Sequence, residues 1–129
     1  MYQLKRDNLM HVPEKWRLEQ QSDIYAFIEK YSFATLVSPS LQSSHLPLML
    51  DSDKQYLIGH FARSNPHWRE LIEDTTKQHL VIFNGPHGYI SPTWYVNKPA
   101  VPTWNYAVVH IKGCAELLSA CVVSLALNN

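Results

Sequence analysis

One short segment combines side chains that can bind a phosphate group. Residues 59–68 read Gly-His-Phe-Ala-Arg-Ser-Asn-Pro-His-Trp, and Asn65 followed by Pro66 is a strong start for a helix. Arg63 and Ser64 would then lie beside the first free backbone amides of that helix, where an anion is stabilised. The alternative is that Asn65 only caps the helix while Arg63 is solvated. Spacing alone leaves both interpretations open.

A second segment is unusually rich in aromatic and proline residues. Four of the eight prolines fall between Pro86 and Pro102, and six of the fifteen aromatic side chains lie between Phe83 and Tyr106. Such side chains could line a flat pocket for an aromatic ligand. Aromatic residues also dominate protein cores and subunit contacts, so this pattern does not choose between a pocket and packing.

Other chemistries find less support in the residue pattern. The seven histidines form no HExxH motif and no zinc-finger spacing with cysteine, which leaves only a metal site assembled from distant residues. Ser38, Ser64 and Ser91 lie in or beside expected strands without a GxSxG motif, and Cys114 has no nearby base to activate it. We therefore expect neither a metal site nor a hydrolase, and the sequence identifies no catalytic residue.

The expected elements that position these segments are mostly short strands. Hydrophobic periodicity and turn residues predict helices over 22–31 and 65–73, strands over 33–38, 46–50, 55–61, 79–84 and 103–112, a turn at 85–88, and an extended segment over 89–96 interrupted by Pro92. Five or six strands with two helices in so short a chain favour a small barrel, an all-β fold with minor α content.

The residues after Gly113 have a different character. Residues 115–127 are almost all small or aliphatic, Glu116 is their only charge, and they show neither alternation nor a turn signal. We expect this tail to form either a helix, for example at a dimer contact, or a replacement strand.

Composition limits the classes of function. The 129 residues suit one domain, and a net charge of zero removes the broad attraction that drives non-specific binding to nucleic acid or anionic membranes. No apolar run reaches the roughly 18–20 residues of a membrane span, and the N-terminus does not read as a secretory signal. Cys114 and Cys121 cannot form the disulfide framework of a small secreted domain, so we expect a cytoplasmic protein.

Several of these segments resemble the PaiB family, described as FMN-binding negative transcriptional regulators. The matching residues are 33–38 (FATLVS), 45–48 (HLPL), 59–68, 82–95 and 101–106, together with His110. They follow one another in family order and span most of residues 1–113. The strings TWNY at 103–106 and YISPTWY at 89–95 are highly specific.

This resemblance implies a split β-barrel of the FMN-binding type with two flanking helices. It also implies a homodimer with ligand sites at the subunit interface. Carried onto this chain, the FMN phosphate would lie at Arg63, Ser64 and Asn65, with His60 beside them. The isoalloxazine ring would lie against residues of the aromatic segment, namely Trp94, Tyr95, Trp104, Asn105 and Tyr106.

The chain also departs from the family. Family members are longer, and the apolar stretch from residue 114 does not resemble them, so we expect a C-terminally truncated protein with a split-barrel domain over 1–113 and a divergent tail over 114–129. The expected function is that of a PaiB-like FMN-binding negative transcriptional regulator. A flavin-dependent oxidoreductase is the alternative, which leaves enzyme activity undecided, and a haem-binding variant of the fold is a third. The zero net charge does not support direct DNA binding.

Overall fold

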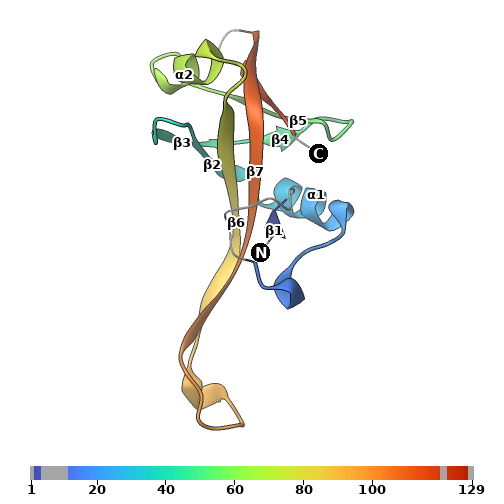
Figure 1. The fold of residues 1–129 in the computed structure, drawn as a ribbon, viewed down its shortest axis with the longest axis vertical. Helices are drawn as coiled ribbons and strands as arrows, with labels where there is room; N and C mark the ends of the chain where they lie inside the picture. The colour runs from blue at the N-terminus through green and yellow to red at the C-terminus, as the bar shows by residue number, and fades with distance from the viewer. Residues whose placement is uncertain (1, 4–11, 120–121, 128–129) are drawn as a thin grey trace.

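A computed structural model describes residues 2–3, 12–119 and 122–127. Its elements, in chain order, are β1 (Tyr2–Gln3), the 3₁₀ helix η1 (Glu14–Trp16), α1 (Gln21–Lys30), β2 (Phe33–Val37), β3 (Ser43–Pro47), β4 (Met49–Leu50), β5 (Tyr56–His60), α2 (His67–Glu73), β6 (Gln78–Ile90), the 3₁₀ helix η2 (Pro92–Trp94), β7 (Thr103–Ser119) and β8 (Val122–Ala126) (Figure 1). Four residues of the predicted tail, including Cys121, lie outside the described residues.

Seven strands form one antiparallel sheet that curls into a half-barrel. Neighbouring strands follow the order β3-β2-β6-β7-β8-β5-β4, and β1 pairs in parallel with β7. The two edge strands, β3 and β4, are separated in the chain only by Leu48, so the sheet must bend back toward its own edge. The predicted class, a mostly β split barrel with two α-helices, is confirmed.

The barrel core follows directly from strand alternation. Ala34 and Leu36 of β2 are buried while their neighbours are not, which is the pattern of a strand with one face toward the core. Helix α1 contributes Ile24 and Ile28, spaced by one helical turn and fully buried. The largest fully buried side chains include Phe83, Leu48, Leu57, Leu71, Ile111 and Leu125.

A close backbone approach joins the two ends of the curled sheet. A Cβ atom built on Gly59 of β5 would lie 2.6 Å from Cδ2 of Leu48 and 2.9 Å from the carbonyl oxygen of Pro47. Both distances are too short for real atoms, so only glycine lets β5 pass this closely beside the end of β3. Gly59 therefore allows β5 and the end of β3 to pack closely where the sheet curls back on itself.

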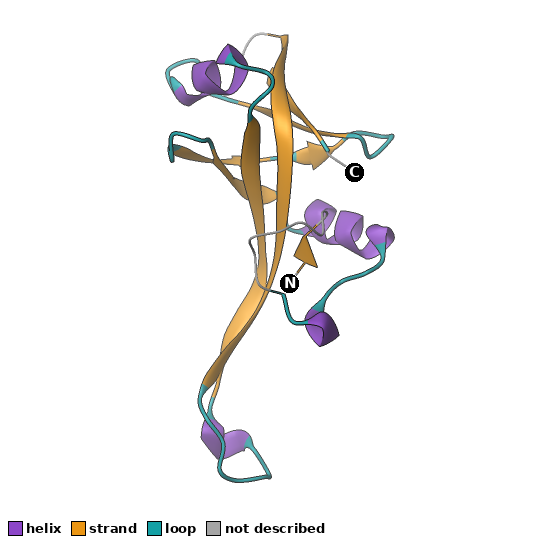
Figure 2. Cartoon of the chain, in the orientation of Figure 1, coloured by secondary structure: helices purple, strands orange, loops and turns teal. Residues whose placement is uncertain are grey.

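The hairpin of β6 and β7 extends far beyond the barrel (Figure 2). The pairing register shifts between Asn84 and His87, and strand pairing then continues to Ile90 opposite Thr103. The predicted turn at residues 85–88 is therefore wrong. A β-bulge absorbs Gly85 and Pro86, and a bulge tolerates the missing N–H of proline without ending the strand. We call residues 84–106, which form the projecting part of the hairpin, the arm.

The C-terminal tail completes the sheet. Strand β7 crosses Gly113 without interruption to Ser119, and β8 pairs with both β7 and β5. In the described part of the tail, the helical alternative is wrong, because these residues form strands. The physical reason is that β5 would otherwise present unpaired backbone groups beside a buried face. Val123 and Leu125 are fully buried in the same core.

Neither α1 nor α2, the α-helices of the described residues, has the length and apolar character needed to cross a membrane.

Candidate functional site

The nine residues predicted to bind the cofactor fall into two separate groups. His60, Arg63, Ser64 and Asn65 lie at the connection between β5 and α2, which we call the β5–α2 turn (residues 60–66). The other five, Trp94, Tyr95, Trp104, Asn105 and Tyr106, belong to the arm. Helix α2 and the tip of the arm lie at opposite ends of the molecule, with the barrel between them (Figure 1).

The distance between the groups follows from the length of β6. This strand begins just after α2 at Gln78 and reaches Tyr89, which pairs with Trp104. Eleven steps along an extended strand span roughly 35 Å. Because α2 lies near one end of β6 and the arm near the other, a single chain keeps the two groups apart (Figure 1).

In the β5–α2 turn, Asn65 is already engaged by the protein. Its Oδ1 accepts a hydrogen bond from the His67 amide at 3.0 Å, and its Nδ2 donates to the hydroxyl of Ser44 at 3.2 Å. Helix α2 begins at His67, somewhat later than the sequence indicated. Asn65 therefore shapes the turn, as expected for a helix start, and the structure favours this structural role over direct ligand binding.

Arg63 and Ser64 are the available polar groups of the same turn. Both side chains are exposed, and neither makes a hydrogen bond with another described residue. The backbone of Arg63 is held in place because its carbonyl accepts a 3.4 Å hydrogen bond from Nε1 of Trp68. His60 is also exposed, at the end of β5. A guanidinium and a hydroxyl on adjacent residues can together bind an anionic oxygen.

Beneath this turn lies a buried network around His67. Nδ1 of His67 lies 2.7 Å from the hydroxyl of Ser44, and Nε2 lies 3.0 Å from the hydroxyl of Ser38. The pairing of Ser38 with His67 has the distance of a nucleophile and its base. However, His67 is 0% and Ser38 is 3% exposed, so no substrate reaches them. The network instead anchors α2 to β2 and β3.

Three histidines make the fold sensitive to acid. Burial lowers the pKa of His67, His79 and His110 below the ordinary value of 6.5. On unfolding, these imidazoles regain their ordinary pKa, so below about pH 6.5 the unfolded state binds protons that the folded state does not. We expect the free energy of unfolding to be constant near pH 7.5 and to fall between about pH 6.5 and pH 5.

Urea unfolding at several pH values measures this effect. The variant His110→Gln, which lacks one of the three imidazoles, should lose less stability over the same pH range. A free energy of unfolding that stays constant down to about pH 5 would contradict the expectation.

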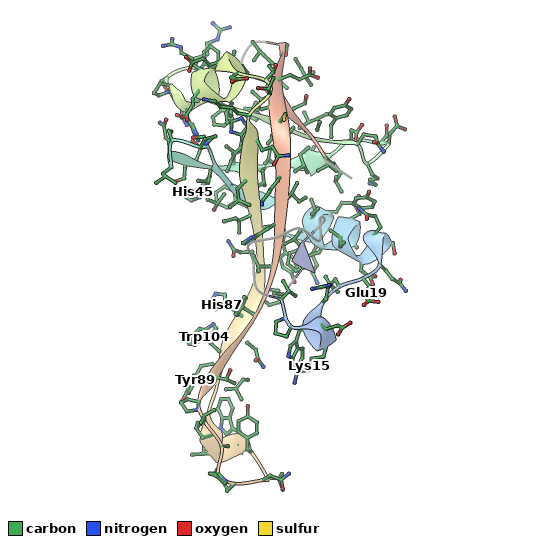
Figure 3. All side chains as sticks on the ribbon, viewed as in Figure 1. Lys15, Glu19, His45, His87, Tyr89 and Trp104 are labelled. Carbon is green, nitrogen blue, oxygen red and sulfur yellow. The ribbon has the colours of Figure 1, made fainter. Side chains whose placement is uncertain are left out.

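The arm carries a ladder of aromatic rings. Tyr89 lies opposite Trp104 across the hairpin, and His87 lies opposite Tyr106. Nε1 of Trp104 donates to Nδ1 of His87 at 3.1 Å, and the two rings stack with centroids 5.6 Å apart (Figure 3). Tyr89 contacts both Trp104 and Trp94, at centroid distances of 6.1 and 6.5 Å. Cross-strand pairing thus holds these rings on one face of the arm.

A small pocket lies at the base of this ladder. It has a volume of about 290 Å³ and is lined by Trp16, Trp104, Asn105 and Tyr106. Three of the predicted residues therefore share one pocket, while Trp94 and Tyr95 lie beyond it, in and just after η2. Although Trp104 and Tyr106 are large aromatic residues, they are 55% and 53% exposed. The exposed part of the Trp104 ring can contact a planar ligand.

Three residues of this region, His87, Tyr89 and Trp16, are not among the nine residues predicted to bind the cofactor. Pairing residues 87–90 with residues 103–106 would have placed His87 and Tyr89 in this region. The turn expected at 85–88 is incompatible with that pairing register. No pattern in the sequence points to Trp16, which η1 places beside the arm. Its neighbour Lys15 lies over the indole ring, 5.3 Å from the ring centre.

The two groups have complementary chemistry. Among the described residues, the arm pocket is lined by aromatic and amide groups without a charged side chain, whereas the β5–α2 turn offers the cation of Arg63 and the hydroxyl of Ser64. The pocket volume lies just below the range of about 300–1,000 Å³ that is usual for small-molecule sites. Each group thus suits only part of a ligand that combines a planar ring with a phosphate. Among the described residues, no cluster of His, Cys, Asp and Glu side chains could hold a metal ion.

Comparison with known proteins relates the chain to one family. The family described as "Putative FMN-binding domain" matches residues 10–127. The chain is 40% identical over 116 residues to "Protease synthase and sporulation protein PAI 2" of Bacillus subtilis, covering 84% of this chain and 54% of that protein. An uncharacterised protein of Saccharomyces cerevisiae is 37% identical over 83 residues, covering 59% of this chain and 48% of its own length.

The extent of these matches bears on the C-terminal tail. Since the family match reaches residue 127, the tail lies within the matched region, and the expectation that it does not resemble the family is wrong. The chain spans about half the length of the curated relatives it matches.

Proposed function

This chain belongs to the family of FMN-binding domains, and on that premise we propose that it binds FMN at sites shared between two copies of the chain. The observation that carries the proposal is the separation of the two groups of predicted site residues. Arg63 and Ser64 suit the phosphate, while Trp104 and Tyr106 suit the ring, yet one pair belongs to the β5–α2 turn and the other to the arm, with the barrel between α2 and the arm (Figure 1). A partner's arm laid beside the β5–α2 turn would bring them together.

Two-fold symmetry would complete both sites of such a dimer at the same time. In a two-fold dimer, the same surfaces of both copies meet, so each arm would lie beside the other copy's β5–α2 turn. Two equivalent sites would result. The exposed aromatic face of the arm supports this proposal, because large apolar patches on a projecting element are commonly contact surfaces.

We extend the proposal to a regulatory role. The Bacillus relative is named for protease synthesis and sporulation, and a regulator of such processes would act on gene expression. The zero net charge of this chain favours action through a partner protein over direct binding to DNA. A salt-titrated binding assay with duplex DNA tests this point, and tight binding that weakens steeply with salt would contradict it.

An oxidoreductase remains the second candidate because of the chemistry of the cofactor. Bound FMN supplies electron transfer, and the exposed aromatic pocket would let a reductant approach. Among the described residues, no Asp, Glu, His, Lys or Arg side chain lines that pocket, so these residues would mainly contribute binding and orientation. Rapid bleaching of flavin absorbance by NAD(P)H would favour the enzyme over the regulator.

The phosphate assignment predicts a difference between two flavins. Arg63→Ala should weaken FMN binding roughly tenfold to a hundredfold, because it removes a charge-assisted hydrogen bond to the phosphate. It should leave the weaker binding of riboflavin, which lacks the phosphate, unchanged. Quenching of flavin fluorescence on titration with protein measures both affinities.

Arg69→Ala provides the matched control. Arg69 is an exposed arginine of α2 that lies over the ring of Trp68, so its loss changes the net charge equally without removing the proposed contact. Equal weakening of FMN binding by both substitutions, or equal weakening of both flavins by Arg63→Ala, would refute the assignment.

A further inference from the structure

The hydroxyl of Ser44 in β3 connects the barrel to the β5–α2 turn. The amide of Asn65 donates to the carbonyl of Ala62 at 2.9 Å, which closes a tight turn of the backbone. Arg63 and Ser64 are its two central residues. From the side chain of Asn65, Nδ2 donates to Oγ of Ser44 at 3.2 Å. This contact therefore links the two residues proposed to bind the phosphate to a strand of the barrel.

Ser44 is a rigid point of attachment because its strand is fixed by the sheet. Its side chain is 8% exposed, it pairs with Leu36 of β2, and β3 is paired with β2 along its whole length. The side chains of Arg63 and Ser64, in contrast, are exposed. A hydrogen bond from Asn65 to a buried hydroxyl of the barrel limits the positions that the turn can take, as supporting contacts behind a binding site do.

The hydroxyl of Ser44 must accept one hydrogen bond and donate another. Oδ1 of Asn65 accepts from the His67 amide, so the group of Asn65 that faces Ser44 is Nδ2, which can only donate. The other polar neighbour of the Ser44 hydroxyl is Nδ1 of His67, at 2.7 Å. A proton on Nδ1 would leave the hydroxyl proton of Ser44 without an acceptor among the described residues. Ser44 therefore donates to an unprotonated Nδ1.

The other ring nitrogen of His67 leads to the same assignment. Burial lowers the pKa of His67, so the ring is neutral near neutral pH and carries one proton. Nε2 lies 3.0 Å from the hydroxyl of Ser38, and that hydroxyl donates its single proton to the carbonyl of Gln42 at 3.2 Å. Ser38 must then accept from Nε2. A carboxylate oxygen of Glu70, 3.8 Å from Nε2, favours a proton on the same nitrogen.

We propose that Ser44 is a positioning residue of the phosphate site, with its hydroxyl oriented by the Nε2–H tautomer of His67. This inference rests on the proposed binding of the FMN phosphate by Arg63 and Ser64. Hydrogen bonds run in one direction from Asn65 to Ser44 and on to His67. Loss of the Ser44 hydroxyl removes the acceptor of Nδ2 of Asn65, so the turn can move while Arg63 and Ser64 are chemically unchanged.

Titration of Ser44→Ala with FMN and with riboflavin tests the positioning role. The affinity for FMN should fall roughly three- to tenfold, because the phosphate-binding side chains are no longer held in one position. The affinity for riboflavin, which lacks the phosphate, should stay unchanged. Ser124→Ala is the matched control, since Ser124 is a strand serine that is 2% exposed and donates to Glu116 rather than to the turn. It should leave both affinities unchanged.

The imidazole nitrogen resonances of His67 give a readout that needs no flavin. In the wild-type chain without ligand, Nε2 should carry the proton and Nδ1 should resonate as an unprotonated acceptor. A proton on Nδ1 would overturn the proposal, whether or not Ser44→Ala folds. The amide resonances of Arg63 and Ser64 should move in Ser44→Ala but not in Ser124→Ala.

The outcomes separate this proposal from the phosphate site itself. If Arg63→Ala weakens FMN binding while Ser44→Ala does not, the positioning role is wrong and the phosphate site stands. If Arg63→Ala leaves the FMN affinity unchanged, the phosphate site is wrong, and a positioning role for it is refuted as well. Equal losses for both flavins in Ser44→Ala, or an equal loss of FMN affinity in Ser124→Ala, would indicate a general loosening of the barrel and overturn the proposal.

Discussion

Gly113→Ala is expected to lower the free energy of unfolding by about 3 kcal/mol, at the upper end of overpacking effects. A Cβ atom at this position would lie 2.3 Å from the carbonyl oxygen of Ala126 and 3.3 Å from its carbonyl carbon. Both are backbone atoms, so no flexible side chain can move aside. The strands themselves must separate.

The position of Gly113 explains why the sheet cannot tolerate this separation. Up to Cys114, β7 pairs with β6, and from Ala115 onward it pairs with β8. Gly113 therefore lies at the corner where one strand passes from one half of the curled sheet to the other. A shift there disturbs both ladders and the burial of Leu125, which pairs with both β5 and β7.

Urea unfolding of Gly113→Ala beside Gly88→Ala measures the effect. Gly88 lies in the same hairpin, but a Cβ there would meet no atom within 4 Å, and no described glycine has a positive φ. Gly88→Ala should change the free energy of unfolding by less than about 1 kcal/mol. Similar stabilities for the two variants would show that the corner relaxes easily and would contradict the expected result.

The second large effect concerns the shared FMN site. Arg63→Ala and Trp104→Ala should each reduce FMN binding by roughly tenfold or more, because one removes the phosphate contact and the other the ring contact. Both side chains are exposed, so neither substitution should unfold the protein. A mixture of the two variants should recover binding that neither has alone.

The recovery follows from the symmetry of a two-fold dimer. In a mixed dimer, the intact turn of the Trp104→Ala copy meets the intact arm of the Arg63→Ala copy, which restores one site, while the other site carries both substitutions. With random exchange of subunits, half of the dimers are mixed, so about a quarter of all sites should bind FMN with full affinity.

Co-refolding of equimolar variants followed by flavin titration measures this fraction. Each variant refolded alone serves as the control for residual binding. Binding by the mixture equal to the average of the two separate variants would refute a site shared between copies. Sedimentation of the same samples shows whether dimers are present.

Much of the fold follows from local patterns along the chain. The spacing of Ile24 and Ile28 indicates α1, and the alternation of Ala34 and Leu36 indicates β2, because each pattern places apolar groups on one face of one element. Asn65 and Pro66 likewise mark the start of α2. These signals are short-range and need no knowledge of the partner elements.

The conformation of two regions could not be predicted from local sequence patterns. The Gly-Pro-His-Gly segment at 85–88 has the composition of a turn, yet a neighbouring strand of matching length keeps it extended through a bulge. The apolar tail lacks alternation because much of β8 is buried, with Val123, Ser124 and Leu125 all inaccessible. In both cases the partner strand decides the conformation.

Residue types and their local spacing are enough to identify the family, the mostly β class and the two chemically distinct segments. The positions of those segments relative to each other depend on long-range strand pairing. The long β6–β7 hairpin carries the aromatic rings away from Arg63, and Asn65 is engaged by Ser44 and the His67 amide. The physical reason is that strand pairing over many residues sets distances that no local pattern encodes.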